Sequence, residues 1–333
     1  MKLLVLDGNS ILNRAFYGIK LLTTKSGEFT NGIVGFLNIL EKVKDETEPD
    51  AVVIAFDMKA PTFRHKAYAG YKAQRKGMPP ELAAQMPVLK ELLGDLGYKI
   101  VTCEGWEADD ILGTFAETCE NTDNTCMIAT GDRDSLQLVS PKTTVRLATT
   151  KFGQSAVTLC DEAYIKETYG VEPKQLIDIK AIQGDTSDNI PGVAGIGEKG
   201  AGELIRKFGS LQYIYDNLDE LDIKPGMKTK LINSKDNAFL SYDLGTIRRN
   251  APIDTELAHY IPGEGDPAAA AQIMTRLELF KLMERLHLTP GAAPTANSAQ
   301  AEEAALLPVK NYKDGAAVLG QCEDCLLYTS PSP

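Results

Sequence analysis

The segment KLLVLD at residues 2–7 is a short apolar run that ends on an aspartate. Two later segments have the same form, AVVIAFD at residues 51–57 and TCMIATGDRD at residues 125–134. Each run is rich in β-branched residues, which is typical of a β-strand. The acidic residues that follow these runs therefore stand where predicted strands end: Asp7, Asp57, Asp132 and Asp134.

Helical patterns alternate with these predicted strands up to about residue 165. Residues 98–103 are another candidate strand, and residues 143–149 are expected to form an edge or hairpin strand. The alternation predicts an α/β fold in which a mainly parallel central sheet has helices on both faces. From about residue 162 to 290 the pattern is mainly helical. Within the first part, apolar residues recur at helical spacing in three segments: 32–47, 81–96 and 107–119.

Two further acidic groups accompany the strand-end aspartates, one in GWEADD at residues 105–110 and one in GDTSDN at residues 184–189. The carboxyl ends of parallel strands face one crevice, where ligands bind. Carboxylates that converge there repel one another unless cations hold them, and Mg²⁺ and Mn²⁺ prefer oxygen ligands. The pattern predicts a metal-dependent phosphate enzyme with these candidate ligands: Asp7, Asp57, Glu107, Asp109, Asp110, Asp132, Asp134, Asp185 and Asp188.

The chain carries a formal net charge of −11, which by itself argues against nucleic acid as a partner. Residues 58–80, however, contain no acidic residue. Their basic side chains are Lys59, Arg64, Lys66, Lys72, Arg75 and Lys76, and the aromatic residues Phe63, Tyr68 and Tyr71 lie among them. A basic, aromatic segment next to a candidate metal ligand suits single-stranded nucleic acid. The alternative is a solvated, charged helix.

A glycine-rich stretch lies at the centre of the helical part, IPGVAGIGEKGAGELIRKFGSL at residues 190–211. GIGEKG at residues 195–200 matches a dinucleotide-binding pattern, but no predicted strand precedes it. The stretch is better explained as a helix, a tight glycine hairpin and a second helix that starts near Lys199. Glycines let a phosphate backbone approach closely, and helix-start N–H groups bind phosphate oxygens without reading sequence. The glycines concerned are Gly192, Gly195 and Gly197. The alternative is a glycine turn used only for packing.

Composition excludes several other classes of site. No apolar run approaches the roughly 20 residues that span a bilayer, and no signal-peptide pattern is present. The six cysteines are scattered, so neither a disulfide framework nor a structural zinc site is expected, and a reducing cytoplasm fits. The three histidines form no metal-spaced cluster. A monomer is the default expectation.

Five segments, in this order along the chain, resemble the 5′–3′ exonuclease and flap endonuclease family in the form found at the N-terminus of bacterial DNA polymerase I. They are LDGNSILNRAFY (6–17), FDMKAPTFRHKAYAGYKAQR (56–75), GWEADDILGT (105–114), TGDRDSLQLV (130–139) and GDTSDNIPGVAGIGEKGA (184–201). The resemblance implies a PIN-like catalytic domain at 1–165 and a helix-hairpin-helix subdomain at 166–290. We expect a linker at 291–308 and the truncated start of a further domain at 309–333.

The resemblance also implies an activity: a Mg²⁺-dependent 5′–3′ exonuclease and flap endonuclease that uses two metal ions, with Mn²⁺ as a possible substitute. Asp7, Asp57, Glu107 and Asp109 are expected at the first ion. Asp132, Asp134 and Asp188 are expected at the second, with Asp110 and Asp185 in support. Arg14, Lys72 and Arg75 are expected to contact the scissile phosphate.

The remaining expectations from the resemblance concern DNA. Arg64, Lys66 and Tyr71 would belong to an arch for a 5′ single strand, and the glycine hairpin with Lys199 would hold the duplex, with room for a monovalent cation. The expected partners are DNA with a 5′ flap, nick or 5′ end and RNA primer–DNA junctions. The expected location is the cytoplasm of a bacterium, in association with the nucleoid. Gly200 departs from the family, which usually has threonine there. The alternatives are an inactive DNA-structure-binding module and a Mg²⁺-dependent phosphatase.

Overall fold

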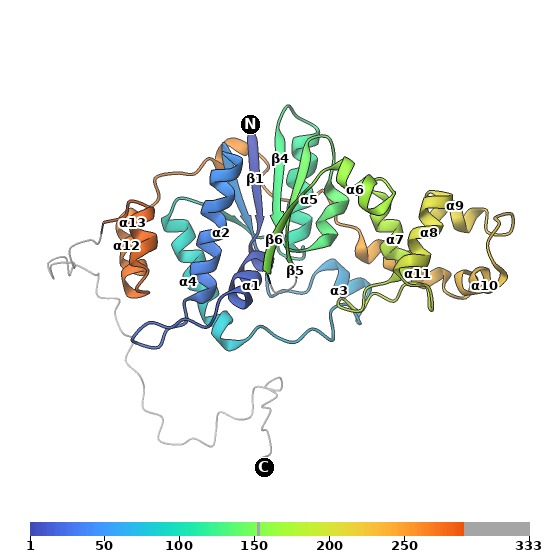
Figure 1. Cartoon of the computed structure of the whole chain (residues 1–333), viewed down its shortest axis with the longest axis horizontal. Helices are drawn as coiled ribbons and strands as arrows, with labels where there is room; N and C mark the ends of the chain where they lie inside the picture. Colours follow the sequence, from blue (N-terminus) through green and yellow to red (C-terminus); the bar gives the residue numbers. More distant parts are fainter. Residues whose placement is uncertain (152–153, 290–333) are drawn as a thin grey trace, which may run out of the picture. The chain divides into compact units, whose positions relative to one another are not determined.

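A six-stranded sheet forms the centre of the computed structural model, which describes residues 1–151 and 154–289. The strand order is β3-β2-β1-β4-β5-β6, and every neighbouring pair is parallel except β5 with β6 (Figure 1). The predicted α/β class with a mainly parallel sheet is therefore confirmed. The strands are β1 (Lys2–Asp7), β2 (Ala51–Ala55), β3 (Lys99–Val101), β4 (Thr125–Thr130), β5 (Thr143–Lys151) and β6 (Gln154–Cys160).

The central strand β1 is buried on both faces, because alternate side chains enter two different cores. Leu4 and Leu6 belong to the core formed with helices on one face, and Leu3 and Val5 belong to the core on the other face. The first core contains residues of α1 (Gly8–Gly18), α2 (Asn31–Thr47) and α4 (Pro80–Asp95). The second is dominated by α5 (Ala108–Glu120). This two-sided cover explains why the strand is apolar at successive positions.

The helical part of the chain has a core of its own, to which Ile182, Ile205 and Leu231 contribute. Short helices connect the larger elements: α3 (Phe63–Ala67) after β2, and the 3₁₀ helices η1 (Arg133–Leu138) and η2 (Leu257–Tyr260). The helices of this part are α6 (Glu162–Tyr169), α7 (Gln175–Gln183), α8 (Glu198–Phe208), α9 (Leu211–Asp216), α10 (Pro225–Asn233) and α11 (Lys235–Gly245).

The strand expected at residues 143–149 as an edge or hairpin strand is β5, and it forms a hairpin with β6. β5 is not an edge strand, because it lies between β4 and β6. Its hairpin partner β6 forms the edge and was not predicted from the sequence. The expected subdomain of residues 166–290 also includes α12 (Pro267–Arg276) and α13 (Phe280–Arg285), which lie on the α4 side of the molecule in Figure 1. Their buried residues belong to the same core as those of α2 and α4.

We therefore propose different boundaries for the helical subdomain, ending it near Gly245 and assigning the following residues to the sheet domain. Ile247, Leu257 and Tyr260 lie in the core beside α5, and Met274 and Met283 lie in the core beside α4. The start near residue 165 stays a prediction. The predicted linker and further domain at 291–333 lie outside the described residues. Among the described helices, none is long and apolar enough to cross a membrane.

Candidate active site

The strand order reverses between β1 and β4, and such a switch point opens a crevice at the carboxyl ends of the strands. Asp7, the last residue of β1, caps α1 by accepting a hydrogen bond from the backbone N–H of Ser10 at 2.9 Å. The Thr130 hydroxyl, at the end of β4, donates to the other Asp7 oxygen at 2.8 Å. The same hydroxyl accepts from the backbone N–H of Asp132 at 3.0 Å. Thr130 therefore positions both Asp7, at the end of β1, and Asp132, just after β4.

The N-terminus of α5 brings further carboxylates to this crevice. Glu107 is the N-cap of α5, and Asp109 lies in its first turn. Asp57, beyond the end of β2, accepts a hydrogen bond from the backbone N–H of Ala108 at 2.7 Å. The positive end of the helix dipole favours all three charges. Asp7, Asp57, Glu107, Asp109 and Asp132 are called the strand-end group below.

The electrostatics of the strand-end group show that its members repel one another. Burial raises the pKa of Asp7 to about 7, and the charges of Asp57 and Asp132 add to this against the lowering effect of the two hydrogen bonds. The pKa of Asp109 is raised well above its ordinary range by burial and by the charges of Asp132 and Asp7. A bound cation would favour the ionised forms of both carboxylates.

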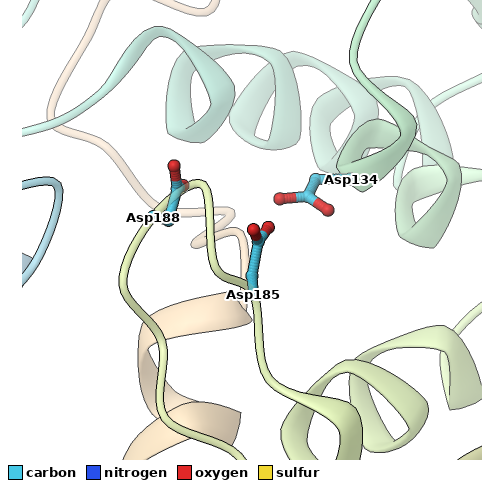
Figure 2. A group of neighbouring side chains, drawn as sticks. All are labelled: Asp134, Asp185 and Asp188. Carbon is cyan, nitrogen blue, oxygen red and sulfur yellow. The ribbon is translucent and has the colours of Figure 1, made fainter. Parts of the chain in front are cut away.

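A second acidic group lies beside the first. Asp134 from η1 and Asp185 and Asp188 from the loop after α7 each offer a carboxylate oxygen, and these atoms lie within 4.8 Å of one another (Figure 2). Figure 2 shows the carboxylates of Asp134 and Asp185 facing each other. The loop is fixed by backbone hydrogen bonds between Asp185 and Ile190. These three aspartates are called the loop group.

Lys180 contacts the loop group, and the sequence analysis did not predict this residue as part of the site. Its ammonium forms ion pairs with Asp134 and with Asp185, the latter at 2.9 Å. Burial raises the pKa of Asp134 to about 6 although Lys180 opposes this. The pKa of Asp185 falls to about 2 against the effect of burial, because Ser187 and Lys180 stabilise its charged form. The available signal was one lysine inside the apolar run of α7, five residues before Asp185.

Three basic residues were expected at the scissile phosphate. Lys72 contacts Glu107 at 2.9 Å, and Arg75 forms an ion pair with Asp188, so these side chains lie against the two acidic groups. The backbone N–H of Lys72 also donates to the carbonyl of Asp188 at 2.9 Å. Arg14 extends from α1 and donates to the carbonyl of Thr149 in β5. Their contact with phosphate stays a prediction.

Arg64 was expected to bind DNA, but it lies inside the protein with 2% of its surface exposed. Its guanidinium contacts both oxygens of Asp110 at 2.8 Å and donates to the carbonyls of Leu244 and Thr246. Asp110 is fully buried and also accepts from the backbone N–H of Arg248. The placement contradicts the expected DNA contact of Arg64. Asp110 is held in this ion pair, and its expected supporting role at a metal ion stays a prediction.

Two further expected DNA contacts are buried. The Tyr71 hydroxyl donates to Glu107 at 3.0 Å, and this hydrogen bond orients a candidate metal ligand. Gly192 has a φ of +63° and donates its N–H to the Ser241 hydroxyl at 2.9 Å, so it serves packing. The other expected DNA contacts lie on the exposed surface: Lys66, Gly195, Gly197 and Lys199.

The donor chemistry of both groups fits divalent cations that prefer oxygen. The first group takes its carboxylates from three strand ends and one helix start, and the three carboxylates of the second group lie within 4.8 Å of one another. Burial, with neighbouring carboxylates adding to it, raises the pKa values of Asp7, Asp109 and Asp134, and a bound metal ion would favour their ionised forms.

Comparisons with known proteins agree with this geometry. A family model described as "5'-3' exonuclease, N-terminal resolvase-like domain" matches residues 2–170, and one described as "5'-3' exonuclease, C-terminal SAM fold" matches residues 171–268. The chain belongs to the 5′–3′ exonuclease family. It is 42% identical over 289 residues to DNA polymerase I of Caldicellulosiruptor bescii, an alignment that covers 87% of this chain and 34% of that protein.

Other members of the family and several solved structures are also similar to this chain. DNA polymerase I of Bacillus subtilis is 41% identical over 257 residues, covering 77% of this chain and 29% of that protein. This 5′–3′ exonuclease family member therefore spans about a third of the length of these relatives. A bacteriophage T5 D15 flap endonuclease in complex with DNA and metal ions superposes with a TM-score of 0.59 and 20% identity, covering 86% of this chain and 98% of that chain. The catalytic core of Rad2 with a DNA substrate gives a TM-score of 0.56 at 19% identity, covering 86% and 91%. At these identities the two structures show the shared fold.

Proposed function

We propose that the chain is a Mg²⁺-dependent 5′–3′ exonuclease and structure-selective 5′ flap endonuclease acting on DNA phosphodiesters. The observation that carries the proposal is the loop group, whose carboxylate oxygens lie within 4.8 Å of one another, together with the ion pairs of Lys72 with Glu107 and of Arg75 with Asp188. Family membership supports the chemistry. We propose 5′ flaps, nicks, 5′ ends and RNA primer–DNA junctions as substrates.

The carboxylates divide naturally between two cations. Asp7, Asp57, Glu107 and Asp109 would hold one ion, and the loop group would hold the other. Asp132 would also serve the second ion, and its charge adds to the raised pKa values of both Asp109 and Asp134. Mg²⁺ or Mn²⁺ held by these carboxylates would supply activation of water near neutral pH and positive charge at the leaving oxygen.

The basic residues supply the positive charge that a phosphodiester needs. Lys72 and Arg75 are paired with Glu107 and Asp188. Both side chains would contact the scissile phosphate, and Arg14 on α1 is the third residue proposed for this role. Positive groups placed where charge develops stabilise the transition state.

The start of α8 is the proposed duplex contact. Gly195, Gly197 and Lys199 are exposed there, and the position of a Cβ on Gly197 meets open space, so a phosphate backbone can approach. The first N–H groups of a helix bind phosphate oxygens. A monovalent cation beside the glycine carbonyls belongs to the same proposal.

Cleavage of a 5′-labelled flap duplex tests the function. We expect cutting near the flap junction with Mg²⁺, none with EDTA, and little with Asp132→Asn, a variant that should keep the fold. Near-normal turnover by Asp132→Asn contradicts the assignment. Flap binding without cutting indicates an inactive module, and phosphate release from a chromogenic monoester without flap cutting indicates a phosphatase.

A further inference from the structure

We propose that a surface pocket formed by Phe63, Lys66, Trp106 and Arg248 binds an unpaired nucleobase of the displaced 5′ strand. The pocket has a volume of about 490 Å³, which lies within the range of small-ligand sites. It is called the aromatic pocket below. The inference rests on the proposed function, because it adds a binding site for the strand that this function would displace.

Two aromatic rings form the wall of the aromatic pocket. Phe63 begins α3, and Trp106 directly precedes Glu107 at the start of α5. Their ring centroids are 5.5 Å apart, with the planes inclined at 65°. The backbone N–H of Phe63 donates to the carbonyl of Gly105 at 3.0 Å, which ties α3 to the turn before α5. Both rings are only partly buried, so they present apolar surface to a ligand.

Cationic groups flank these rings. The guanidinium carbon of buried Arg64 lies 4.5 Å from the Phe63 centroid, and that of Arg248 lies 5.6 Å from it. Lys66 is exposed at the rim, and the Arg248 side chain is 39% exposed and ion-paired with Asp243. Bases stack on aromatic rings while cations attract the adjoining phosphates, so this combination suits single-stranded nucleic acid.

Polar groups complete the lining. Glu104 and Asn250 also line the aromatic pocket, and both can hydrogen-bond to the edge of a base. The carboxylate of Glu104 opposes a phosphate. The ligand that matches the whole lining is therefore a base in the pocket, with its phosphates at the Lys66 and Arg248 rim.

The pocket is preorganised by the Arg64–Asp110 ion pair. Asp110 contacts the guanidinium of Arg64 and accepts from the backbone N–H of Arg248 at 2.9 Å, so one carboxylate positions cations that lie over Phe63. A wall held by buried contacts loses little freedom when a ligand binds.

The place of the pocket along the chain links it to the candidate active site. α3 follows β2 and Asp57, and it lies within the basic segment at residues 58–80. Trp106 adjoins Glu107, which contacts Lys72 of the same segment. A single strand that leaves the carboxylates along the basic segment therefore meets Phe63 and Trp106.

Trp106 is the only tryptophan of the chain, so its fluorescence reports on the pocket directly. The probe is a duplex with an oligothymidine 5′ flap, titrated into the Asp132→Asn variant with Mg²⁺ while a gel checks that the DNA stays intact. The matched ligand has abasic nucleotides in the flap, which keep the charge and remove the bases. We expect quenching by the thymidine flap, little by the abasic flap, and roughly 5- to 100-fold weaker binding of the abasic flap.

Variants separate stacking from general DNA binding. Trp106→Ala should bind both flaps equally, and Trp106→Tyr should restore most of the preference for bases. Tyr213→Ala, which removes an exposed aromatic ring on α9, should keep the wild-type preference. Duplex DNA without a flap should bind all of these variants alike.

Equal quenching by both flaps, or an unchanged preference of Trp106→Ala for the thymidine flap, overturns the proposal that the aromatic pocket binds a nucleobase. Normal flap cleavage with such a result would leave the proposed function intact. A preference for bases in a chain that cuts no flap would support the pocket and reject the nuclease activity.

Discussion

Arg64 is a buried cation that joins Asp110 and Glu107 to the carbonyls of Leu244 and Thr246 at the end of α11, with distances of 2.8 Å to Asp110 and 3.3 Å to Glu107. Removing it leaves buried negative charge without a partner. We expect Arg64→Met to lower the free energy of unfolding by about 3–5 kcal/mol in urea denaturation. Lys66→Met is the matched control on the same helix, and its exposed side chain predicts a change within about 0.5 kcal/mol.

An Arg64→Met protein as stable as the wild type would show that the ion pair contributes nothing net. Asp110→Asn offers a second measurement, because it leaves the guanidinium buried without its carboxylate. Loss of stability in both variants supports the structural role of this pair.

The raised pKa of Asp7 predicts that the stability of the metal-free protein depends on pH. Its folded-state pKa of about 7 exceeds the ordinary value of 3.8, so the folded chain holds a proton that the unfolded chain releases. Linkage then lowers the free energy of unfolding as pH rises from about 4 to about 7. Asp7→Asn removes this loss, so in EDTA we expect the variant to gain about 1–3 kcal/mol on the wild type across that window.

Urea denaturation at a series of pH values measures this difference. With Mg²⁺ above pH 7 the wild type should gain more stability than Asp7→Asn, because only the wild type has the ionised ligand. Parallel stability curves for the two proteins in EDTA would contradict the raised pKa of Asp7.

At the scale of elements, the loop between α7 and α8 depends on two glycines in different ways. Gly192 has a φ of +63°, and a Cβ there would meet the backbone of Gly184. We expect Gly192→Ala to cost at least about 2 kcal/mol of stability. Gly197 has an ordinary φ of −93° and open space at its Cβ position, so Gly197→Ala should change stability by less than about 0.5 kcal/mol.

DNA binding distinguishes the two positions further. If a phosphate backbone approaches the start of α8, Gly197→Ala should weaken duplex binding several-fold with the fold intact, measured by fluorescence anisotropy. Unchanged binding would remove Gly197 from the proposed duplex contact. An unchanged denaturation midpoint for Gly192→Ala would show that this loop adjusts without cost.

At the scale of the whole molecule, the chain returns to its first domain after the helical part. The backbone N–H of Asp266 donates to the carbonyl of Asp95 at 2.7 Å, and Met274, Leu277 and Met283 enter the core with α2 and α4. We expect a chain ended at residue 262 to lose several kcal/mol of stability, at about 1.5–3 kcal/mol for each large apolar side chain removed.

A chain ended at residue 289 is the matched control and should keep the denaturation midpoint of the full chain, because the described residues lie within one compact unit. Equal stability of the two truncated chains would reject the proposed domain boundary near Gly245.

The sequence by itself determined the α/β class, the order of strands and helices, and the placement of acidic residues at strand ends. These features are local, since the period of apolar residues and the residue that follows each run are visible in the chain. The strands β1, β2 and β4 and the helices α2, α4 and α5 appear close to their predicted positions. The family resemblance rested on the same local segments.

Only the tertiary structure decided which of the charged, aromatic and glycine residues are buried. Arg64, Tyr71 and Gly192 have the residue types of a DNA-binding surface, yet contacts with Asp110, Glu107 and Ser241 place them inside. Lys180 joins the loop group, and α12 joins the first core. Each of these outcomes depends on partners more than 30 residues away in the chain or on a turn between elements, and the spacing of residues in the sequence carries no record of such contacts.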